Sequence, residues 1–211
     1  MELILVRHAL PERVDIPGGD IPGGVAVDRR PADPGLTETG ERQAARLVDA
    51  LRATDVAGLY TSPQRRALGT ATPLAAALDR DPTPVADLRE YDADAGHYVP
   101  VHEMPRLDPR GWERMVAGLL PAYVDTDEFT ARVYDACERL VEAHPGRQSV
   151  VVVTHAGVIN TYLARLLGID RPLAFPLDYA GLTRVIAGRD GRRAVRTVNE
   201  IAHVEDLLAV H

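Results

Sequence analysis

Histidine, arginine and carboxylate side chains follow four short apolar runs of the chain, and these residue types are suited to binding and transforming a small anion. The pairs, in chain order, are Arg7-His8, Arg65-Arg66, Arg89-Glu90 and Thr154-His155. An imidazole can act as a nucleophile or carry a proton near neutral pH, and guanidinium groups bind phosphate oxygens in pairs. A nearby carboxyl group can serve as general acid and base. Phosphate is therefore the leading candidate for the anion.

The four apolar runs are typical of buried strands, and helical patterns separate them. We expect strands at 3–6, 56–60, 84–88 and 150–153, and helices at about 37–51, 65–78, 128–143 and 158–167. Thr37 is a predicted helix N-cap, since Glu38 and Glu41 follow it in the first turn. Two further strands, 182–187 and 194–198, flank Asp190-Gly191, which is a hairpin signal.

The order of these elements predicts an α/β fold, a three-layer sandwich with a mostly parallel sheet, an antiparallel edge strand and helices on both faces. Residues 91–127 are irregular, and Pro100, Pro105, Pro109 and Pro121 limit any helix there to about 112–120. We therefore interpret these residues as a small cap insertion within a single domain spanning 1–211. In an open parallel sheet, ligands bind outside the carboxyl ends of the strands. The four pairs should therefore converge on one pocket.

Composition excludes several other kinds of site. All 24 Lys+Arg residues are arginine, so a P-loop, a pyridoxal Schiff base, a Ser-Lys dyad and a protein-kinase site cannot be built. Only Ser62 and Ser149 occur, neither in a G-x-S-x-G setting, which argues against a serine hydrolase. The single Cys137 cannot form an internal disulfide or a Cys-x-x-Cys zinc site, and this fits a reducing cytoplasm.

Charge and hydropathy bear on partners and location. The net charge of −7 argues weakly against nucleic acid or an anionic membrane as a partner. No apolar run approaches the roughly 18 residues that span a bilayer, and the first residues, MELILVRHALPE, do not read as a signal or transit peptide. A cytoplasmic location and a small-molecule partner are expected, and a homodimer remains open.

The motifs RHA, LTETGERQA, TSPQRRALGTA, LREYD and VTHAGVI occur in this order, and VNEIAH closes the chain. Together they resemble the histidine phosphatase superfamily, whose fold is that of phosphoglycerate mutase. The resemblance covers nearly the whole chain. It implies that His8 is the nucleophile and becomes a phosphohistidine, while Arg7, Arg66 and His155 bind the phosphoryl oxygens. It also implies that Glu90 is the general acid on the leaving oxygen, with no metal and no organic cofactor.

Neighbouring alternatives remain at several positions. In the family, the arginine that binds the phosphoryl oxygens lies four residues after the serine, and this spacing favours Arg66 over Arg65. Asp92 or Asp94 could substitute for Glu90. Arg29 and Arg30 are candidate substrate contacts and could equally be solvated surface charges.

Departures from the family pattern bear on the reaction. Ala9 and Pro11 stand where the family commonly has glycine and often threonine, which removes or replaces a contact. Residues 91–127 lack the recognisable segments of glycolytic mutases. A metal-independent phosphomonoester hydrolase is therefore favoured, with a phosphoglycerate-type phosphomutase as the alternative.

Two alternatives come from other classes of protein. The segment HAGVINTYLARLLGI resembles the second helix of a helix-turn-helix, but a run of four valines stands where the first helix should be. A binding module that keeps the fold and has lost turnover is the other. The intact set Arg7, His8, Arg66, Glu90 and His155 argues against it.

Overall fold

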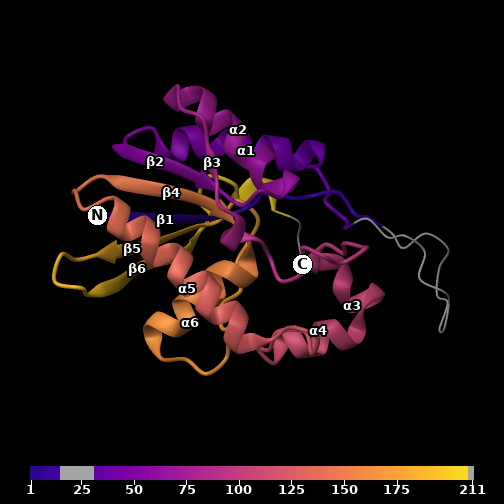
Figure 1. Cartoon of the computed structure of the whole chain (residues 1–211). Helices are drawn as coiled ribbons and strands as arrows, with labels where there is room; N and C mark the ends of the chain where they lie inside the picture. The colour runs from indigo at the N-terminus through magenta and orange to yellow at the C-terminus, as the bar shows by residue number, and fades with distance from the viewer. Residues whose placement is uncertain (15–30, 209–211) are drawn as a thin grey trace.

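The computed structural model describes residues 1–14 and 31–208, and a six-stranded sheet forms the middle of this part of the chain (Figure 1). The strand order is β3-β2-β4-β1-β5-β6. The strands are β1 (Glu2–Arg7), β2 (Val56–Thr61), β3 (Thr83–Pro84), β4 (Ser149–Thr154), β5 (Leu182–Ala187) and β6 (Arg193–Glu200). Strands β1 to β4 are parallel to one another, whereas β5 runs antiparallel to β1 and β6 antiparallel to β5.

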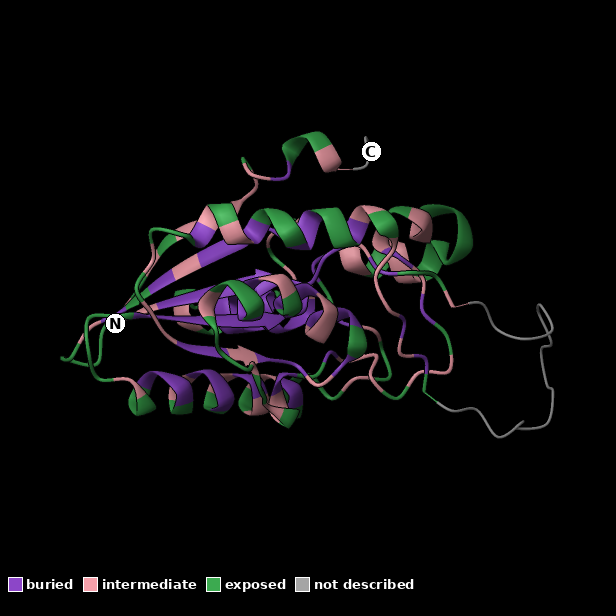
Figure 2. Cartoon of the chain, turned by 90° about the horizontal axis from the view of Figure 1, so that it is seen from above, coloured by how far each residue is buried: buried purple, intermediate pink, exposed green. Residues whose placement is uncertain are grey.

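Helices cover both faces of this sheet (Figure 2). The main helices are α1 (Glu38–Leu51), α2 (Arg65–Leu78), α5 (Thr126–Ala143) and α6 (Ala156–Leu167). The pair α1 and α2 packs together on one face, and the pair α5 and α6 on the other. The predicted three-layer α/β sandwich is therefore confirmed, and its antiparallel edge consists of two strands. The predicted hairpin is also present, with Gly191 at a φ of 82° in its turn.

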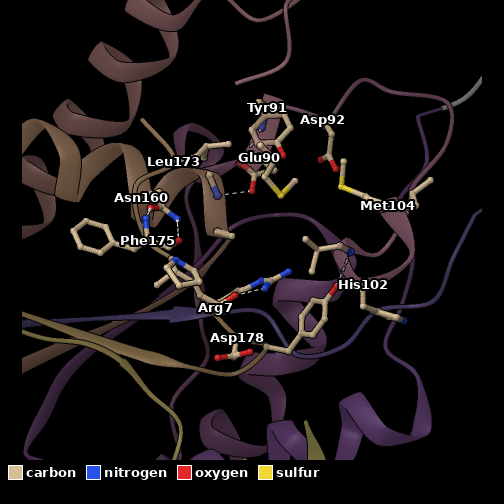
Figure 3. Close-up of a pocket in the computed structure, with 18 of the residues that line it drawn as sticks. Arg7, Glu90, Tyr91, Asp92, His102, Met104, Asn160, Leu173, Phe175 and Asp178 are labelled. Carbon is tan, nitrogen blue, oxygen red and sulfur yellow. Dashed lines mark hydrogen bonds between the residues drawn. The ribbon is translucent and has the colours of Figure 1, made fainter. Parts of the chain in front are cut away.

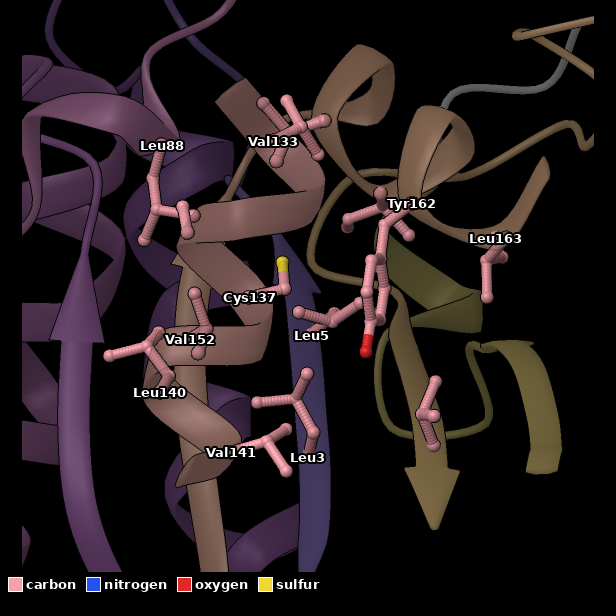
Figure 4. Packing of buried hydrophobic residues seen from close by; sticks show 14 of the residues in the cluster. Leu3, Leu5, Leu88, Val133, Cys137, Leu140, Val141, Val152, Tyr162 and Leu163 are labelled. Carbon is pink, nitrogen blue, oxygen red and sulfur yellow. The ribbon is translucent and has the colours of Figure 1, made fainter. Parts of the chain in front are cut away.

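The central strands are apolar throughout because both of their faces are covered. Leu3 and Leu5 of β1 pack in the core beneath α5 and α6, where Cys137 also lies (Figure 4). Ile4 and Val6 point the other way and join the core beneath α1 and α2. Successive side chains of a strand alternate between the two faces of a sheet, so one short run of apolar residues feeds both cores. This double burial fixes the register of β1 and β4, and therefore the positions of the residues that follow them.

The predicted start of α1 is confirmed in atomic detail. The Thr37 side chain accepts a hydrogen bond from the Gly40 amide at 3.0 Å, as an N-cap does. The helices α5 and α6 each begin two residues earlier than the sequence predicts, because Asp125 and His155 stand at their N-caps. None of the helices in residues 1–14 and 31–208 is both long enough and apolar enough to span a membrane.

The predicted strand at 84–88 is wrong in most of its length. Only Thr83 and Pro84 pair with β2, and the chain then turns into a 3₁₀ helix over Ala86–Leu88. The Val85 amide still donates to the Thr61 carbonyl at 2.8 Å, but β2 ends at Thr61, so the pairing stops there. The buried Leu88 side chain and the Thr154 hydroxyl, which donates to the Leu88 carbonyl at 2.9 Å, hold this turn against β4. Arg89 and Glu90 therefore follow a turn, not a strand.

The helix predicted around 112–120 is also displaced. Residues 91–127 contain a 3₁₀ helix, Val101–Glu103, and two short helices, α3 (Met104–Leu107) and α4 (Pro109–Val116). Proline at the start of a helix costs nothing, because the first amides have no partner within the helix. Pro105 and Pro109 each stand in the first turn of a helix, so they begin helices and do not exclude them.

Candidate active site

A cavity of about 660 Å³ opens at the carboxyl ends of β1, β2 and β4 (Figure 3). Arg7, His8, Arg66 and Glu90 line its inner part, and residues from α3 and α4 line its outer part. Each of these four side chains is at least nine-tenths buried, so their positions are set by the packing of the fold. Three of the four predicted pairs thus contribute side chains to the lining, whereas Arg65 and Arg89 are exposed and do not line the cavity.

His8 is held in the orientation of a nucleophile. Its Nδ1 lies 2.8 Å from the Ala9 carbonyl oxygen, which can only accept, so Nδ1 carries the proton and Nε2 keeps its lone pair. Burial lowers the pKa of His8 well below its usual value, and the nearby Arg66 and Arg7 lower it further. The backbone after His8 is fixed by the Ala9 amide, which donates to Thr70 of α2 at 2.9 Å. A neutral imidazole with one free nitrogen is therefore available at pH 7.

Arg7 and Arg66 flank His8, and each is fixed by two contacts. Arg7 donates to the Leu177 carbonyl and lies 3.8 Å from the centre of the Tyr179 ring. Arg66 donates to Asp92 at 2.9 Å and lies 4.6 Å from the centre of the Tyr98 ring. The Nε atoms of both arginines and Nη1 of Arg66 are buried without a hydrogen-bond partner among the described residues. Such donors are rare in folded proteins, and an oxyanion in the pocket would satisfy them.

His155 begins α6 and lies beside His8, with the two ring centres 5.1 Å apart. Its Nε2 lies 2.8 Å from the Ser62 hydroxyl, and its buried Nδ1 has no partner in the described part of the chain. Burial lowers the pKa of His155 well below its usual value, and Arg66 is the next cause. Ser62 thus holds the second histidine in place.

Glu90 is the buried carboxyl group of the pocket. Its two oxygens accept hydrogen bonds from the Gly157 amide at 2.9 Å and the Tyr91 amide at 3.1 Å. Burial raises the pKa of Glu90 to about 7, with the charge of Asp92 as a second cause. A side-chain Cβ at position 157 would lie 2.3 Å from the nearer Glu90 oxygen, so this close approach requires glycine. The raised pKa keeps the protonated form of Glu90 accessible near neutral pH, which a general acid requires.

The alternatives left open by the sequence are separated by the geometry. Arg66 is fully buried in the pocket, whereas Arg65 is exposed and donates to the Asp33 carbonyl. Asp92 lines the pocket but is bound to Arg66, and Asp94 is 86% exposed beside Arg89. The candidate contacts Arg29 and Arg30 lie outside the described residues.

Two pocket residues, Tyr98 and Tyr179, support the two arginines and have no signal in the local motifs. Gln64, from the motif TSPQRRALGTA, accepts a hydrogen bond from the Glu90 amide at 2.9 Å. The tyrosines come from loops far apart in the chain, so spacing could not have found them. Among the described residues, no three His, Cys, Asp or Glu side chains form a group that could hold a metal ion.

Residues 3–200 match the Histidine phosphatase superfamily (branch 1). The chain belongs to this family. A bifunctional protein of Mycobacterium tuberculosis is 30% identical over 178 residues, which are 82% of this chain and 49% of that protein. The chain thus spans about half the length of this relative. Phosphoserine phosphatase 1 of Hydrogenobacter thermophilus is 28% identical over 209 residues, which are 97% of this chain and 94% of that protein.

Solved structures of other proteins have the same fold. Bacillus stearothermophilus YhfR superposes with a TM-score of 0.73 at 24% identity, covering 97% of this chain and 99% of that chain. A mycobacterial glucosyl-3-phosphoglycerate phosphatase in complex with inorganic phosphate has a TM-score of 0.72 at 20% identity, covering 97% of this chain and 99% of that one. These likenesses show the fold of the chain.

Proposed function

We propose that this member of the histidine phosphatase superfamily is a phosphomonoester hydrolase that works through a phosphohistidine on His8, with residues 91–127 as the cap over its substrate. One observation carries the proposal. A neutral imidazole with a free Nε2 lies in a cavity that Arg7 and Arg66 also line, and these two arginines and His155, which lies beside His8, have buried nitrogen atoms without partners among the described residues. A phosphoryl group is the ligand that needs both a nucleophile and several fixed hydrogen-bond donors.

In the first step, Nε2 of His8 attacks phosphorus in line with the leaving oxygen. The N–P bond forms, the P–O bond to the alcohol breaks, and the leaving oxygen takes the proton of Glu90. Arg7, Arg66 and a donor from His155 stabilise the charge that spreads over the equatorial oxygens. The Arg66 guanidinium must share its donors between phosphate and Asp92, which is bound to it at 2.9 Å.

In the second step, water attacks the phosphorus of the phosphohistidine. Glu90, now a carboxylate, takes a proton from that water, and the N–P bond breaks. The products are inorganic phosphate, a neutral His8 and a protonated Glu90, so the cycle closes with no net change in the protein. The pKa of Glu90 near 7 suits both roles, since the group then gives and takes a proton at similar cost.

The test uses the purified chain and phenyl phosphate in the presence of a chelator. Wild-type protein should release inorganic phosphate, and His8→Ala should abolish the release. His97→Ala is the matched control, because His97 is exposed and does not line the cavity. Activity that survives in His8→Ala would contradict the mechanism.

A second measurement separates a hydrolase from a phosphomutase. Rapid quenching in alkali should trap a labelled phosphohistidine on wild-type protein and not on His8→Ala. Water should then be the main acceptor of the label. Transfer to a second phosphorylated hydroxy acid in preference to water would show that the chain is a mutase.

A further inference from the structure

The cavity has two ends of different chemistry. The inner end holds the histidines, the arginines and Glu90, whereas the outer end is lined by apolar side chains of α3, α4 and the segment before β5. Trp112, Met115 and Val116 stand at positions i, i+3 and i+4 of α4, so they share one face of that helix. Met104 of α3 and Leu173 face the same cavity (Figure 3).

These outer side chains are only partly covered by the protein itself. Trp112, Met115, Met104 and Leu173 are half-buried, and Val116 is 66% exposed. Apolar surface that borders a cavity and remains accessible gains free energy when a ligand covers it. A phosphoryl group at the inner end would leave it uncovered, since a volume of about 660 Å³ is large enough for a drug-sized molecule.

The charges of the cavity disfavour a second anionic group on the substrate. Among the described residues, Arg7 and Arg66 are the arginines that line it, and the phosphoryl group would engage both. The remaining ionisable groups that line it are the carboxyl groups of Glu90, Asp92 and Asp178, the imidazoles of His8 and His102, and three tyrosines. A carboxylate on the alcohol part would meet apolar surface at the α4 face and negative charge near Asp92 or Asp178, and both are unfavourable.

We infer that the substrate is a phosphomonoester whose alcohol part is bulky, apolar and free of negative charge, such as a long alkyl or an aromatic group. This inference rests on the proposed function and specifies its substrate class. The face of α4 formed by Trp112, Met115 and Val116 binds the alcohol part, while the inner end binds the phosphoryl group. Small anionic monoesters such as phosphorylated hydroxy acids are poor substrates for this cavity.

The first test is a homologous series from ethyl to octyl phosphate, assayed below their micelle-forming concentrations. All members have nearly the same leaving group, so differences in kcat/KM report binding of the chain. The expected increase is up to about fourfold per methylene until the cavity is filled. A matched monoester with a terminal carboxylate should be at least about tenfold worse than the methyl-terminated compound of equal length.

A pair of substitutions at one exposed position tests the charge argument without threatening the fold. Val116→Arg should raise kcat/KM for the carboxylate-terminated compound relative to the methyl-terminated one, and Val116→Glu should lower it. Leu119→Ala is the control, because Leu119 is 41% exposed and does not line the cavity. The control should leave the preference unchanged.

A binding measurement makes the inference testable apart from turnover. Trp112 is the single tryptophan of the chain and lines the cavity, so its fluorescence reports occupancy. In His8→Ala the ester remains intact, and octyl phosphate should change this fluorescence at lower concentrations than the carboxylate-terminated compound. Equal or reversed affinities would overturn the inference.

The two proposals fail in different ways. If neither phenyl phosphate nor any alkyl phosphate is hydrolysed, the proposed function is contradicted. Hydrolysis with a flat chain-length series, or with preference for the carboxylate, would leave the function standing and overturn the inferred substrate class.

Discussion

The inner and outer ends of the cavity are built in different ways. The inner end lies at strand ends: Arg7 ends β1 and His8 follows it, Arg66 lies in the first turn of α2 after β2, and His155 follows β4. The outer end is carried by residues 91–127, whose helices are short and whose large apolar side chains stay partly exposed. The candidate catalytic side chains therefore lie where the backbone cannot move without disrupting the sheet. The surface that would select the substrate is placed where the chain can vary at little cost to stability.

This difference follows from burial. A strand covered on both faces has one register, because a slip by one residue would turn every apolar side chain to the wrong layer. A segment with few core contacts has no such constraint, so its local stability is low and its conformation depends on caps and turns. Changes at the inner end should therefore affect the rate of reaction, and changes at the outer end should affect substrate preference.

The largest expected effect is at Arg66. Arg66→Ala should lower kcat/KM about 10³-fold for every monoester tested, because Arg66 would bind the phosphoryl group that all of them share. Arg66→Lys should recover only part of this loss, since an ammonium group cannot donate in the same forked geometry. A loss that depends on the alcohol part would contradict the division between the two ends. Steady-state kinetics on phenyl and hexyl phosphate provide the measurement.

The next effect concerns Glu90 and pH. A general acid must be protonated, so activity on alkyl phosphates is present below the Glu90 pKa of about 7 and should be lost as pH rises through it. The lowered pKa of His8 should preserve activity well below pH 6.5. Glu90→Gln should remove the alkaline limb and cost about 10²-fold on hexyl phosphate, but far less on 4-nitrophenyl phosphate. Comparing wild type and variant on one ester cancels the ionisation of the substrate. Equal losses on both esters would assign Glu90 a positioning role only.

A smaller effect is expected from Gly157→Ala, which tests whether the close approach of the Gly157 backbone to Glu90 is needed for activity. The new Cβ would lie 2.3 Å from a Glu90 oxygen and 2.7 Å from the Tyr91 ring, so the carboxyl group must shift. A shift of about 1 Å can cost up to about 10²-fold, and roughly tenfold is expected on hexyl phosphate. Gly168→Ala is a control at the end of α6, where nothing lies within 4 Å of an added Cβ, although its φ of 66° gives that variant its own strain. Unchanged kinetics in Gly157→Ala would show that the inner end can adapt.

The smallest effects are expected from substitutions at two helix N-caps, one in each region. Thr37 caps α1 beside the sheet and Asp108 caps α4, where it accepts a hydrogen bond from the Gly111 amide at 3.0 Å. Thr37→Ala should lower the free energy of unfolding by about 1 kcal/mol and leave kinetics unchanged. Asp108→Ala should instead reduce the preference for long alkyl phosphates, with little change in denaturant midpoint. The opposite pattern would contradict the contrast between the regions.

Much of the inner end could be predicted because its residues directly follow strands that identify themselves. Residues 3–6 and 150–153 are apolar without interruption, and a run of that kind is typical of a central parallel strand. The choice of Arg66 over Arg65 also agrees with the geometry, since one residue along a helix changes the direction of the side chain by about 100°. The strand predicted at 84–88 is wrong in most of its length because β2 ends at Thr61 and the chain turns into a 3₁₀ helix at Ala86, which the local apolar pattern does not show.

The outer end was less predictable, because proline has two meanings that the sequence does not separate. The proline content of residues 91–127 predicts that Pro105 and Pro109 limit helices, but each stands in the first turn of one. The stacking of Tyr98 on Arg66 and of Tyr179 on Arg7 joins loops that are distant in the chain. The hydrogen bond between Ser62 and His155 spans 93 residues and had no local signal.

The sequence by itself determined the layers of the fold, the order of its elements and the set of chemical groups at the strand ends. These follow from local periodicity and from residue type, which do not depend on distant parts of the chain. Only the tertiary structure decided which protons those groups carry and which donors remain without partners. The pKa of Glu90, the tautomer of His8 and the apolar lining contributed by α4 all depend on burial and on neighbours distant in sequence. Desolvation and through-space charge are properties of the folded chain, so no reading of local pattern could supply them.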